Sequence, residues 1–390
     1  MYRRLICSGP SQIRLSMPMR ICLRQRACSH SYHVLTSSAA SASDYATVDG
    51  NYFWEGSVSM QTIDVAILTY KPDKSFFRQI DLLKSQSVKV NRIIIMNTEE
   101  KYITNLLFGK SLGKSGCLVD IYNLSQKEFN HGRTRNAAAG RSDADFLIFM
   151  TQDAMPEDEY LVENLLRPFE DEKVAVSYAR QLPAANAGPI ERFNRQFNYP
   201  DGDRVQSYSD IPTLGIKTYF CSDVCACYRM SYFRELGGFI DNAIFNEDMI
   251  YAHKAIFEDY SIYYASGARV IHSHNYSMKQ QFKRNFDLGV SQADHPEVFA
   301  GVSSENEGKK LVSGCIEYLS AEKKSYLVPK FIAHCGARYI GYKLGFNYKK
   351  LSKKIIWRCT SNRAYWRHHW DMTNIPADVH AGYGKNAEGL

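Results

Sequence analysis

Three short polar stretches carry the side chains best suited to chemistry: 151–153 (Thr-Gln-Asp), 246–248 (Asn-Glu-Asp) and 272–274 (His-Ser-His). Asp153 directly follows an apolar run, and a carboxylate at the end of a buried strand is a typical ligand for a divalent cation. His272 and His274 are two residues apart, so in an extended segment both rings point to the same side. Neutral imidazoles suit Mn²⁺ or Zn²⁺ better than Mg²⁺.

Glu247 and Asp248 are adjacent carboxylates at the start of a predicted helix. A carboxylate is basic enough at neutral pH to take a proton from a sugar hydroxyl as that oxygen attacks, so we interpret this pair as the source of a general base. Structural alternatives stay open for all three stretches. The acidic residues could simply cap helices, and the histidines could be one buried and one exposed structural residue.

The elements that must position these side chains follow an alternating pattern from Ile63 onward. Apolar runs predict strands at 63–70, 92–97, 117–123, 145–150 and 174–178, with helices at 76–87, 133–142 and 160–169 between them. Continuous β-branched runs separated by helices are typical of a parallel sheet that is covered on both faces.

The second half of this region is less regular. Residues 181–220 show little periodicity, which is long for an inert loop, and we interpret them as a substrate-facing segment. A strand at 221–228, a Gly237-Gly238 turn, a helix from Glu247 and a strand at 260–272 follow. The turn at 130–136 opens an Ala-rich helix with Arg133, Arg135 and Asn136, which suits a phosphate-bearing ligand.

Taken together, these motifs resemble the family 2 inverting glycosyltransferases of the GT-A fold. They are most similar to the bacterial rhamnosyltransferase branch that uses dTDP-L-rhamnose. The likeness covers residues 62–290 and rests on strand 63–70, the 130–136 turn, 151–154, Gly237-Gly238-Phe239 with 246–248, and 272–277. The resemblance implies an α/β, Rossmann-like, mostly parallel mixed sheet flanked by helices, with a C-terminal helical and basic extension.

The resemblance also implies roles for single residues. Asp153 keeps the last carboxylate of the family's Asp-x-Asp motif and would bind Mn²⁺ or Mg²⁺, which bridges the nucleotide diphosphate. His272 matches the family's histidine at the metal, with His274 as the alternative ligand. Asp248 matches the catalytic base, and Glu247 would orient the acceptor or the base. The positions matched to the nucleotide sugar are Thr69, Tyr70, Asn97, Arg135, Asn136 and Gln152.

The implied activity is metal-dependent inverting transfer of L-rhamnose from dTDP-β-L-rhamnose. The acceptor would be a hydroxyl of a glycan or of a polyprenyl-linked glycan in surface polysaccharide synthesis, and a β-linked donor would give an α-linked product. Two alternatives remain open. The donor could be UDP-glucose, UDP-galactose or UDP-galactofuranose, or the protein could be a non-catalytic binder of nucleotide sugars or glycans.

Composition narrows the class of protein. Of 390 residues, 45% are hydrophobic and 23% charged, which is ordinary for a globular protein. The net charge of +7 is a mild basic excess, and its cations do not form a compact aromatic platform, so we expect no nucleic-acid binding. The ten cysteines lack metal-finger spacing and indicate reduced thiols and a cytoplasmic location.

The pattern predicts three parts: residues 1–59 outside the fold, a GT-A domain at 60–300 and a helical extension at 301–390. No acidic residue precedes Asp44 although six arginines do, which is typical of a targeting leader. A disordered tail or a wrong start remains open, since Met60 stands just before the first strand. Residues 325–370 are apolar, aromatic and basic. They form either a helical cap on the sheet or a surface helix on anionic lipid at the inner face of the cell membrane.

Overall fold

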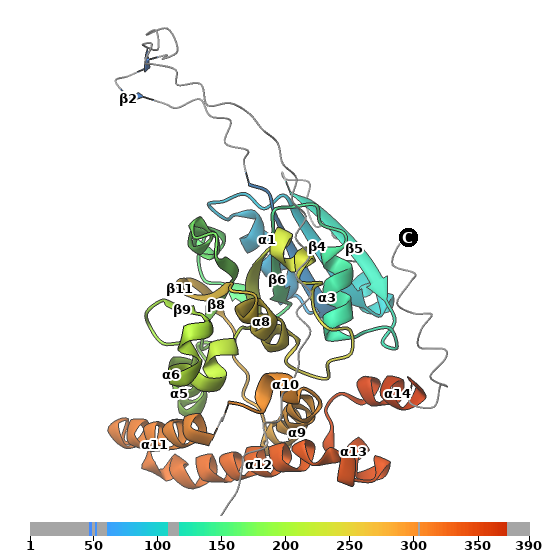
Figure 1. The fold of residues 1–390 in the computed structure, drawn as a ribbon, viewed down its shortest axis with the longest axis vertical. Coiled ribbons are helices and arrows are strands. Elements are labelled where there is room, and N and C mark those ends of the chain that lie inside the picture. Colours follow the sequence, from blue (N-terminus) through green and yellow to red (C-terminus); the bar gives the residue numbers. More distant parts are fainter. Residues whose placement is uncertain (1–46, 49–50, 53–60, 108–116, 303–304, 373–390) are drawn as a thin grey trace, which may run out of the picture. The chain divides into compact units, whose positions relative to one another are not determined.

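The computed structural model describes residues 47–48, 51–52, 61–107, 117–302 and 305–372 (Figure 1). The chain divides into a unit at 1–59 and a second unit at 60–390. Within the first unit the described residues are two short antiparallel strands, β1 (Thr47–Val48) and β2 (Asn51–Tyr52). The predicted leader or tail otherwise lies outside the described residues.

The described part of the second unit is built on a nine-stranded sheet. Its strands are β3 (Ile63–Tyr70), β4 (Arg92–Thr98), β5 (Leu118–Leu124), β6 (Phe146–Thr151), β7 (Met155–Pro156), β8 (Val174–Leu182), β9 (Arg204–Gln206), β10 (Cys225–Arg229) and β11 (Ser261–Ile271). Their order is β5-β4-β3-β6-β10-β8-β11-β7, and β9 also pairs with β11. These strands lie close to the ranges that the apolar runs predicted.

β10 interrupts the parallel order of the main sheet. β5, β4, β3 and β6 are mutually parallel, whereas β10 runs antiparallel to both β6 and β8. The chain leaves β3 toward β4 and β5 on one side and later returns to β6 on the other. Ligands of open α/β sheets bind beyond the carboxyl ends of strands at such a switch point.

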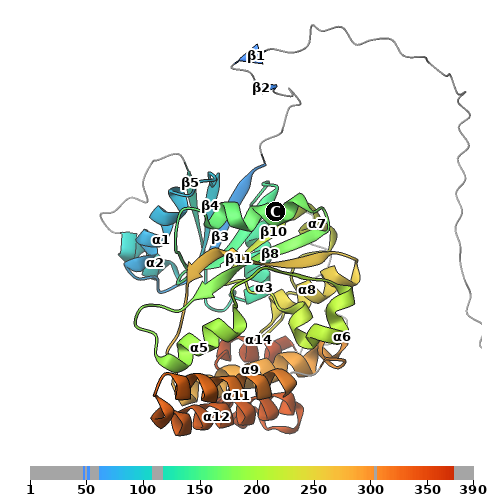
Figure 2. The same ribbon diagram turned by 90° about the vertical axis from the view of Figure 1, so that its left-hand side faces the viewer.

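Both faces of the sheet are buried, as the sequence predicted. Alternate residues of β4 and β6 enter two separate apolar clusters. Ile94 and Phe149 pack on one face, whereas Ile95 and Ile148 pack on the other. Apolar residues of α3, α7 and α8 cover the first face, and those of α1 and α4 cover the second (Figure 2). This layered packing fixes the ends of the strands from which the candidate site residues project.

The helices among the described residues are α1 (Ser75–Lys84), α2 (Glu100–Leu107), α3 (His131–Ala139), α4 (Leu161–Leu166), α5 (Pro189–Asn198), α6 (Ile211–Leu214), α7 (Met230–Glu235), α8 (Glu247–Phe257), α9 (Met278–Asp294), α10 (Pro296–Phe299), α11 (Glu305–Ala321), α12 (Val328–Phe346), α13 (Lys353–Cys359) and α14 (Arg363–Met372). Short 3₁₀ turns are η1 (Arg167–Glu170), η2 (Tyr208–Asp210), η3 (Gly215–Tyr219), η4 (Ser325–Leu327) and η5 (Tyr348–Lys350).

Helices α9 and α11 to α14 form a helical layer at one end of the sheet (Figures 1 and 2). The layer begins with α9 at Met278, ahead of the boundary expected at residue 301. Helices α9 and α12 touch backbone to backbone. A Cβ added to Gly345 or Gly341 of α12 would collide with the carbonyl oxygen of Phe286 or Phe282, respectively. Glycine at these positions is therefore what lets the two helices pack so closely.

None of the described helices combines the length and the apolar character needed to cross a bilayer. The seven cysteines of the described residues are free thiols, as the sequence predicted. Burial raises the pKa of Cys221, Cys225 and Cys227 and keeps these thiols protonated.

Candidate active site

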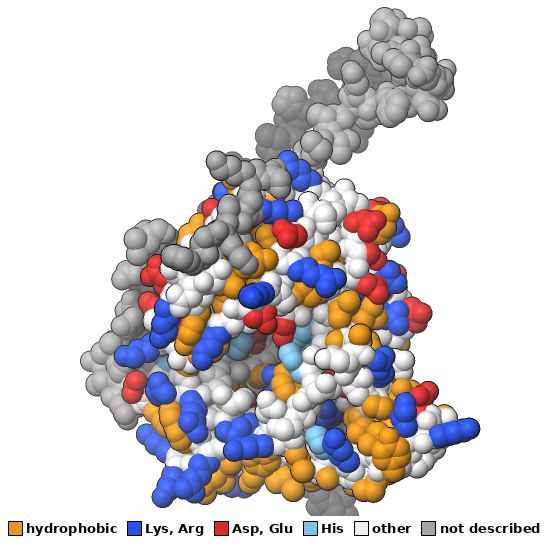
Figure 3. All heavy atoms as spheres, turned by 180° about the vertical axis from the view of Figure 1, so that it is seen from behind, with side chains coloured by type: hydrophobic (Ala, Val, Ile, Leu, Met, Phe, Trp, Pro, Cys, Tyr) orange, Lys and Arg blue, Asp and Glu red, His pale blue; other side chains and the backbone are white. Residues whose placement is uncertain are grey.

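A cavity of about 520 Å³ lies beyond the carboxyl ends of β6, β8 and β11. It receives the predicted residues Arg135, Asp153, Glu247, Asp248, His272 and His274. In Figure 3 histidine and acidic side chains gather at a hollow near the middle of the face that is shown. Residues from three distant stretches of the chain therefore meet in one place.

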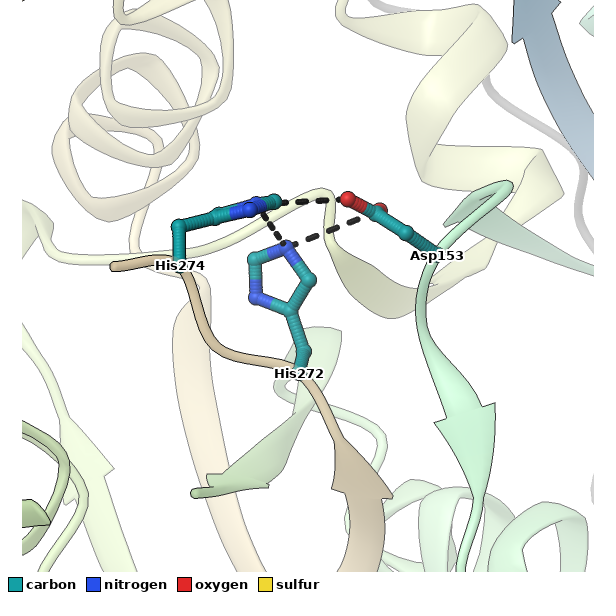
Figure 4. A group of neighbouring side chains, drawn as sticks. All are labelled: Asp153, His272 and His274. Atoms are coloured by element: carbon teal, nitrogen blue, oxygen red, sulfur yellow. Dashed lines mark hydrogen bonds and ion pairs between the residues drawn. The ribbon is translucent and has the colours of Figure 1, made fainter. Parts of the chain in front are cut away.

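One group in the cavity has the composition of a metal centre. Asp153 projects from the end of β6, and His272 and His274 follow the end of β11 (Figure 4). His274 Nε2 lies 3.0 Å from His272 Nε2 and 3.2 Å from Asp153 Oδ2, and His272 Nε2 lies 3.6 Å from Asp153 Oδ1. One ligand atom from each residue lies within 4.8 Å of the others.

Gln181 determines which nitrogen of His272 carries the proton. The Gln181 amide nitrogen donates to Tyr199 Oη at 2.6 Å and to Ser222 Oγ at 2.9 Å. Its Oε1 must therefore accept, and it lies 2.9 Å from His272 Nδ1. With the proton on Nδ1, the lone pair of His272 Nε2 points toward His274 and Asp153. An outer partner that orients a ligating histidine in this way is a regular feature of metal sites.

The protonation states of His272 and Asp153 also favour metal binding. Burial lowers the pKa of His272 despite the nearby carboxylate, so the ring is neutral at physiological pH. Burial would raise the pKa of Asp153, but the interactions with the His272 and His274 rings beside it outweigh burial and lower the pKa, so the carboxyl is ionised. Two imidazole nitrogens and a carboxylate oxygen are a donor set that fits Mn²⁺ better than Mg²⁺. These three residues could hold such an ion.

Beside this group, Arg135 lies between two buried carboxylates. Its Nη1 donates to Glu247 Oε1 at 2.6 Å, and its Nε lies 3.0 Å from Asp223 Oδ2. All three side chains are less than a tenth exposed. Tyr228 Oη also donates to Asp223 at 2.6 Å. Sequence matching assigned Arg135 to the nucleotide sugar, whereas its contacts in the structure hold Glu247 and Asp223 in place.

Asp248 is the half-buried member of this acidic cluster and lines the cavity. It accepts hydrogen bonds from the backbone N–H groups of Met249 at 2.8 Å and Asp223 at 3.3 Å. Burial, followed by the charges of Asp223 and Glu247, raises the pKa of Asp248 well above its ordinary value. For Glu247, burial is outweighed by Arg135, and its pKa is lowered. The two adjacent carboxylates thus differ: Asp248 is the stronger base, and Glu247 stays ionised.

The turn that presents these carboxylates has an unusual backbone. Asn246 has φ +66°, the left-handed region that non-glycine residues rarely adopt, although Asn tolerates it better than most. Its side-chain amide donates to Ser291 Oγ of α9 at 3.3 Å, and that hydroxyl donates to the Phe245 carbonyl at 2.6 Å. A helix of the helical layer therefore holds the turn that positions Glu247 and Asp248.

The predicted nucleoside residues lie together, at the ends of the neighbouring strands and outside the lining of this cavity. Thr69 and Asn97 are register partners, and Thr69 Oγ1 donates to Asn97 Oδ1 at 3.1 Å. Asn97 donates in turn to Asn123 of β5 at 2.8 Å. Thr69, Asn97 and Asn123 thus form a row of hydrogen-bonded side chains across three strands. Contacts of Thr69 and Asn97 with the base and ribose stay predictions.

Tyr70 and Gln152 join the ends of β3 and β6. Gln152 accepts from Tyr70 N at 2.9 Å and donates to Tyr70 O at 3.0 Å. The Tyr70 ring is 40% exposed and packs edge-on against Tyr102 at 5.6 Å. An exposed aromatic pair beside the switch point has the form of a platform for a planar group.

Asn136 makes contacts of a structural kind. Its amide accepts from Phe239 N at 2.9 Å and donates to Phe239 O at 2.8 Å, so it fixes the turn after Gly237 and Gly238. Both glycines have positive φ. A nucleotide contact by Asn136 stays a prediction.

Several residues of the cavity escaped the sequence analysis, notably Asp223, Gln181, Arg195 and Arg284. Asp223 sits in the Cys-rich stretch before β10, where no motif marks it. The lack of periodicity in segment 181–220 had nevertheless suggested that this segment faces a substrate. Four of its residues line the cavity: Gln181, Arg195, Tyr199 and Phe220.

Comparisons with known proteins bear on both fold and family. The profile of glycosyl transferase family 2 matches residues 65–237. The O-antigen chain rhamnosyltransferase RfbN of Salmonella typhimurium is 35% identical over 308 residues, which cover 78% of this chain and 96% of that protein. The O-antigen chain rhamnosyltransferase WbaN of Salmonella anatum is 39% identical over 251 residues, 63% of this chain and 79% of that one.

A solved structure is similar as well. A mannosyltransferase of Pyrobaculum calidifontis in complex with GDP-Man and Mn²⁺ superimposes with a TM-score of 0.52 at 10% identity. The match covers 75% of this chain and 89% of that chain. At this identity the likeness concerns the fold alone, and it confirms the expected GT-A architecture.

Proposed function

Because this chain belongs to glycosyl transferase family 2, we propose that it transfers L-rhamnose from dTDP-β-L-rhamnose to a hydroxyl of a glycan during O-antigen assembly. The donor follows from the motifs and from the activity named for its two Salmonella relatives. The observation that carries the proposal is the convergence of Asp153, His272 and His274 with Asp248 in a single cavity.

In this proposal Asp248 is the general base. Its raised basicity lets it take the proton of the acceptor hydroxyl as that oxygen attacks the anomeric carbon from the face opposite the nucleotide. Single displacement of this kind inverts the anomeric configuration. Glu247 stays ionised against Arg135, so it keeps the Asp248 turn in position and offers an acceptor for a sugar hydroxyl.

Asp153, His272 and His274 would hold Mn²⁺ or Mg²⁺, and Mn²⁺ suits the nitrogen ligands better. Held by these residues, a divalent ion would supply positive charge to offset the charge that develops on a departing diphosphate. Thr69, Asn97 and the Tyr70 ring are proposed to contact the nucleoside. They lie at the ends of β3 and β4, next to the strand that carries Asp153.

We further propose that α12 rests on an anionic membrane at the inner face of the cell, where it meets a polyprenyl-linked acceptor. No Asp or Glu occurs from Lys323 to Trp370, whereas Lys and Arg occur twelve times. Ile332, Tyr339 and Ile340 share the exposed face of α12, with Tyr339 59% and Ile340 55% exposed. Blue and orange side chains crowd the lower edge of Figure 3. An exposed apolar face amid cations is typical of a helix that lies on anionic lipid.

The donor assignment is tested by incubating the protein with Mn²⁺ and each of a panel of dTDP-, UDP- and GDP-sugars, and measuring binding and slow hydrolysis. We expect dTDP-rhamnose to be preferred, with binding weakened by EDTA. Preference for a UDP-hexose or UDP-galactofuranose would replace the donor, and indifference to every sugar nucleotide would make the protein a non-catalytic binder.

A further inference from the structure

A second cavity, of about 270 Å³, adjoins the first and is walled by α5, α9 and α12. The two cavities share the lining residues Arg195, Tyr199, Phe220 and Tyr276. We call the second one the side cavity. Because the walls are common, a molecule that fills the side cavity can extend toward Asp248.

The side cavity carries an uncompensated positive charge. Its charged lining residues are two guanidinium groups, Arg195 and Arg338, and a single carboxylate, Glu191. Glu191 pairs with Arg195 at 2.8 Å. Arg338 donates to Gln281 Oε1 at 3.0 Å and has no ion pair among the residues that the structure describes. Burial, only partly offset by the charges around it, lowers the pKa of Arg338. A half-buried guanidinium without a carboxylate partner favours an anionic ligand.

The remaining walls suit a sugar. Asn194 is 8% exposed, and its Oδ1 is buried without a hydrogen-bond partner in the described residues, so it can accept from a ligand hydroxyl. Asn198 adds a second amide, and Tyr199, Phe220 and Tyr276 supply aromatic surface. Amides and aromatic rings around a cation match a carbohydrate that bears a negative group.

The position of Arg338 indicates which kind of molecule carries that negative group. Arg338 lies on α12 beside Tyr339 and Ile340, which belong to the exposed apolar face of the same helix. An amphiphile whose chain lies along that face would bring the first charged group of its head close to Arg338. Such a molecule would have its lipid on the exposed face of α12, its anionic group at Arg338 and its sugar among the remaining walls of the side cavity.

We propose that the side cavity binds the diphosphate that links lipid to glycan in the acceptor, with Arg338 as its main contact. The sugars then run past Arg195 and Tyr276 into the cavity that holds Asp248. This assignment rests on the proposed glycosyl transfer and adds to it the chemistry of the acceptor.

The test compares two acceptors that carry the same oligosaccharide, one on a polyprenyl diphosphate and one on a neutral alkyl chain, in the same detergent micelles. For Arg338→Gln we expect the KM for the diphosphate acceptor to rise about tenfold relative to the KM for the neutral one, as befits a lost charged hydrogen bond. Arg338→Lys should recover part of this ratio, because the charge returns.

Two further variants control the result. Asn198→Asp adds a negative charge to the side cavity while it keeps every cation, and it should raise the same KM ratio even if Arg338→Gln folds poorly. Lys310→Gln removes an exposed cation of α11 that lines neither cavity and should leave the ratio unchanged.

The proposal is overturned if the ratio stays constant in Arg338→Gln and Asn198→Asp, or if both acceptors are affected equally. Turnover of dTDP-rhamnose by the unmodified protein with the polyprenyl diphosphate acceptor is measured separately. Failure there removes the proposed function, whereas a constant ratio with normal turnover removes only the role of the side cavity.

Discussion

At the scale of single residues, two adjacent carboxylates, Glu247 and Asp248, have opposite electrostatic environments. Arg135 compensates Glu247, while the half-buried Asp248 faces Asp223 and Glu247. Groups whose surroundings drive their pKa values apart are a physical signature of acid–base catalysis. This asymmetry supports the proposed catalytic role of the pair over a role in capping the helix alone.

Asp248→Asn should lower kcat by roughly 10²-fold or more while donor binding is kept. Because the base acts only when deprotonated, kcat/KM of the unmodified enzyme should rise with pH through a pKa above the ordinary carboxylate range. The folded protein holds this proton where the unfolded chain has released it, so its unfolding free energy falls as pH rises through that window. Asp248→Asn should remove that fall, which is measured as Tm against pH.

The control is Glu258→Gln at the opposite, exposed end of α8, which should change neither kcat nor the pH profile. Near-normal turnover in Asp248→Asn would remove Asp248 as the base.

Gln181→Leu should weaken Mn²⁺ binding by about 10–100-fold, the usual effect of losing the partner that orients a ligating histidine. The measurement is a Mn²⁺ titration followed by electron paramagnetic resonance, with and without dTDP. Asp153→Ala should abolish the binding, and His253→Gln, a histidine that packs on Tyr219 and does not line the cavity, should leave it intact. Full activity in excess EDTA would contradict a metal role.

The residue scale also shows what a sequence can predict of a site. Asp153, Asp248 and His272 were predicted because they stand at strand and helix ends in the order of the family that the sequence resembles, and all three line one cavity. Gln181 and Asp223 could not be found, because a Gln inside β8 and an Asp before β10 belong to no local pattern. Their roles come from contacts with side chains far away in the sequence: His272 lies 91 positions after Gln181, and Arg135 lies 88 positions before Asp223 (223 − 135).

At the scale of elements, strand positions followed from apolar runs because a buried strand must be continuous in β-branched residues. The direction of β10 could not be predicted from the sequence, because the apolar pattern of a short strand is the same whether the strand is parallel or antiparallel to its neighbours. Its antiparallel placement between β6 and β8 is decided by the connections on either side.

Asn246 offers a test of how the catalytic turn is held. Asn246→Ala and Asn246→Gly both lose the bond to Ser291, but alanine also strains the left-handed backbone. We expect Asn246→Ala to be less stable than Asn246→Gly by about 1–2 kcal/mol. The comparison is made by urea unfolding, and equal stability would contradict the requirement for a left-handed conformation here.

Packing of α9 against α12 offers a second test. Gly345→Ala should destabilise the protein, because its methyl group would collide with the Phe286 carbonyl. Gly336→Ala, on the exposed side of the same helix, meets nothing within 4 Å and should stabilise it by up to about 1 kcal/mol through helix propensity. A Tm that rises in Gly345→Ala as it does in Gly336→Ala would refute close packing at Gly345.

At the scale of the whole molecule, α9 joins the cationic helical layer to the turn before α8, because Ser291 Oγ donates to the Phe245 carbonyl at 2.6 Å. Within the layer, Asp287 of α9 accepts hydrogen bonds from Thr360 at 2.5 Å and Ser361 N at 2.9 Å, and Tyr348 donates to Asp294 at 2.6 Å. The sequence predicted helices and positive charge here but not that α9 would join them, because its contacts with α12 depend on glycines whose role no periodicity reveals.

The membrane proposal is tested by flotation of the full-length protein with vesicles. We expect binding to vesicles containing phosphatidylglycerol, release by salt, and little binding to phosphatidylcholine alone, since each surface Lys or Arg contributes about 1 kcal/mol on anionic lipid. Ile340→Asp should abolish flotation, whereas Ser313→Asp adds the same charge on exposed α11 outside the apolar face and should weaken it only slightly. Identical flotation of both variants would count against docking through α12.

The position of α9 between α12 and the turn that carries Asp248 has one further consequence. It contacts α12 on one side, through Tyr342 and Gln292 at 2.8 Å, and through Ser291 it supports the turn that bears Asp248. If α12 rests on a bilayer, Asp248, the proposed base, stands at a fixed height above the lipid. The enzyme would then act as a ruler: a growing chain is extended only when its terminal sugar reaches that height, so chain length itself selects the substrate.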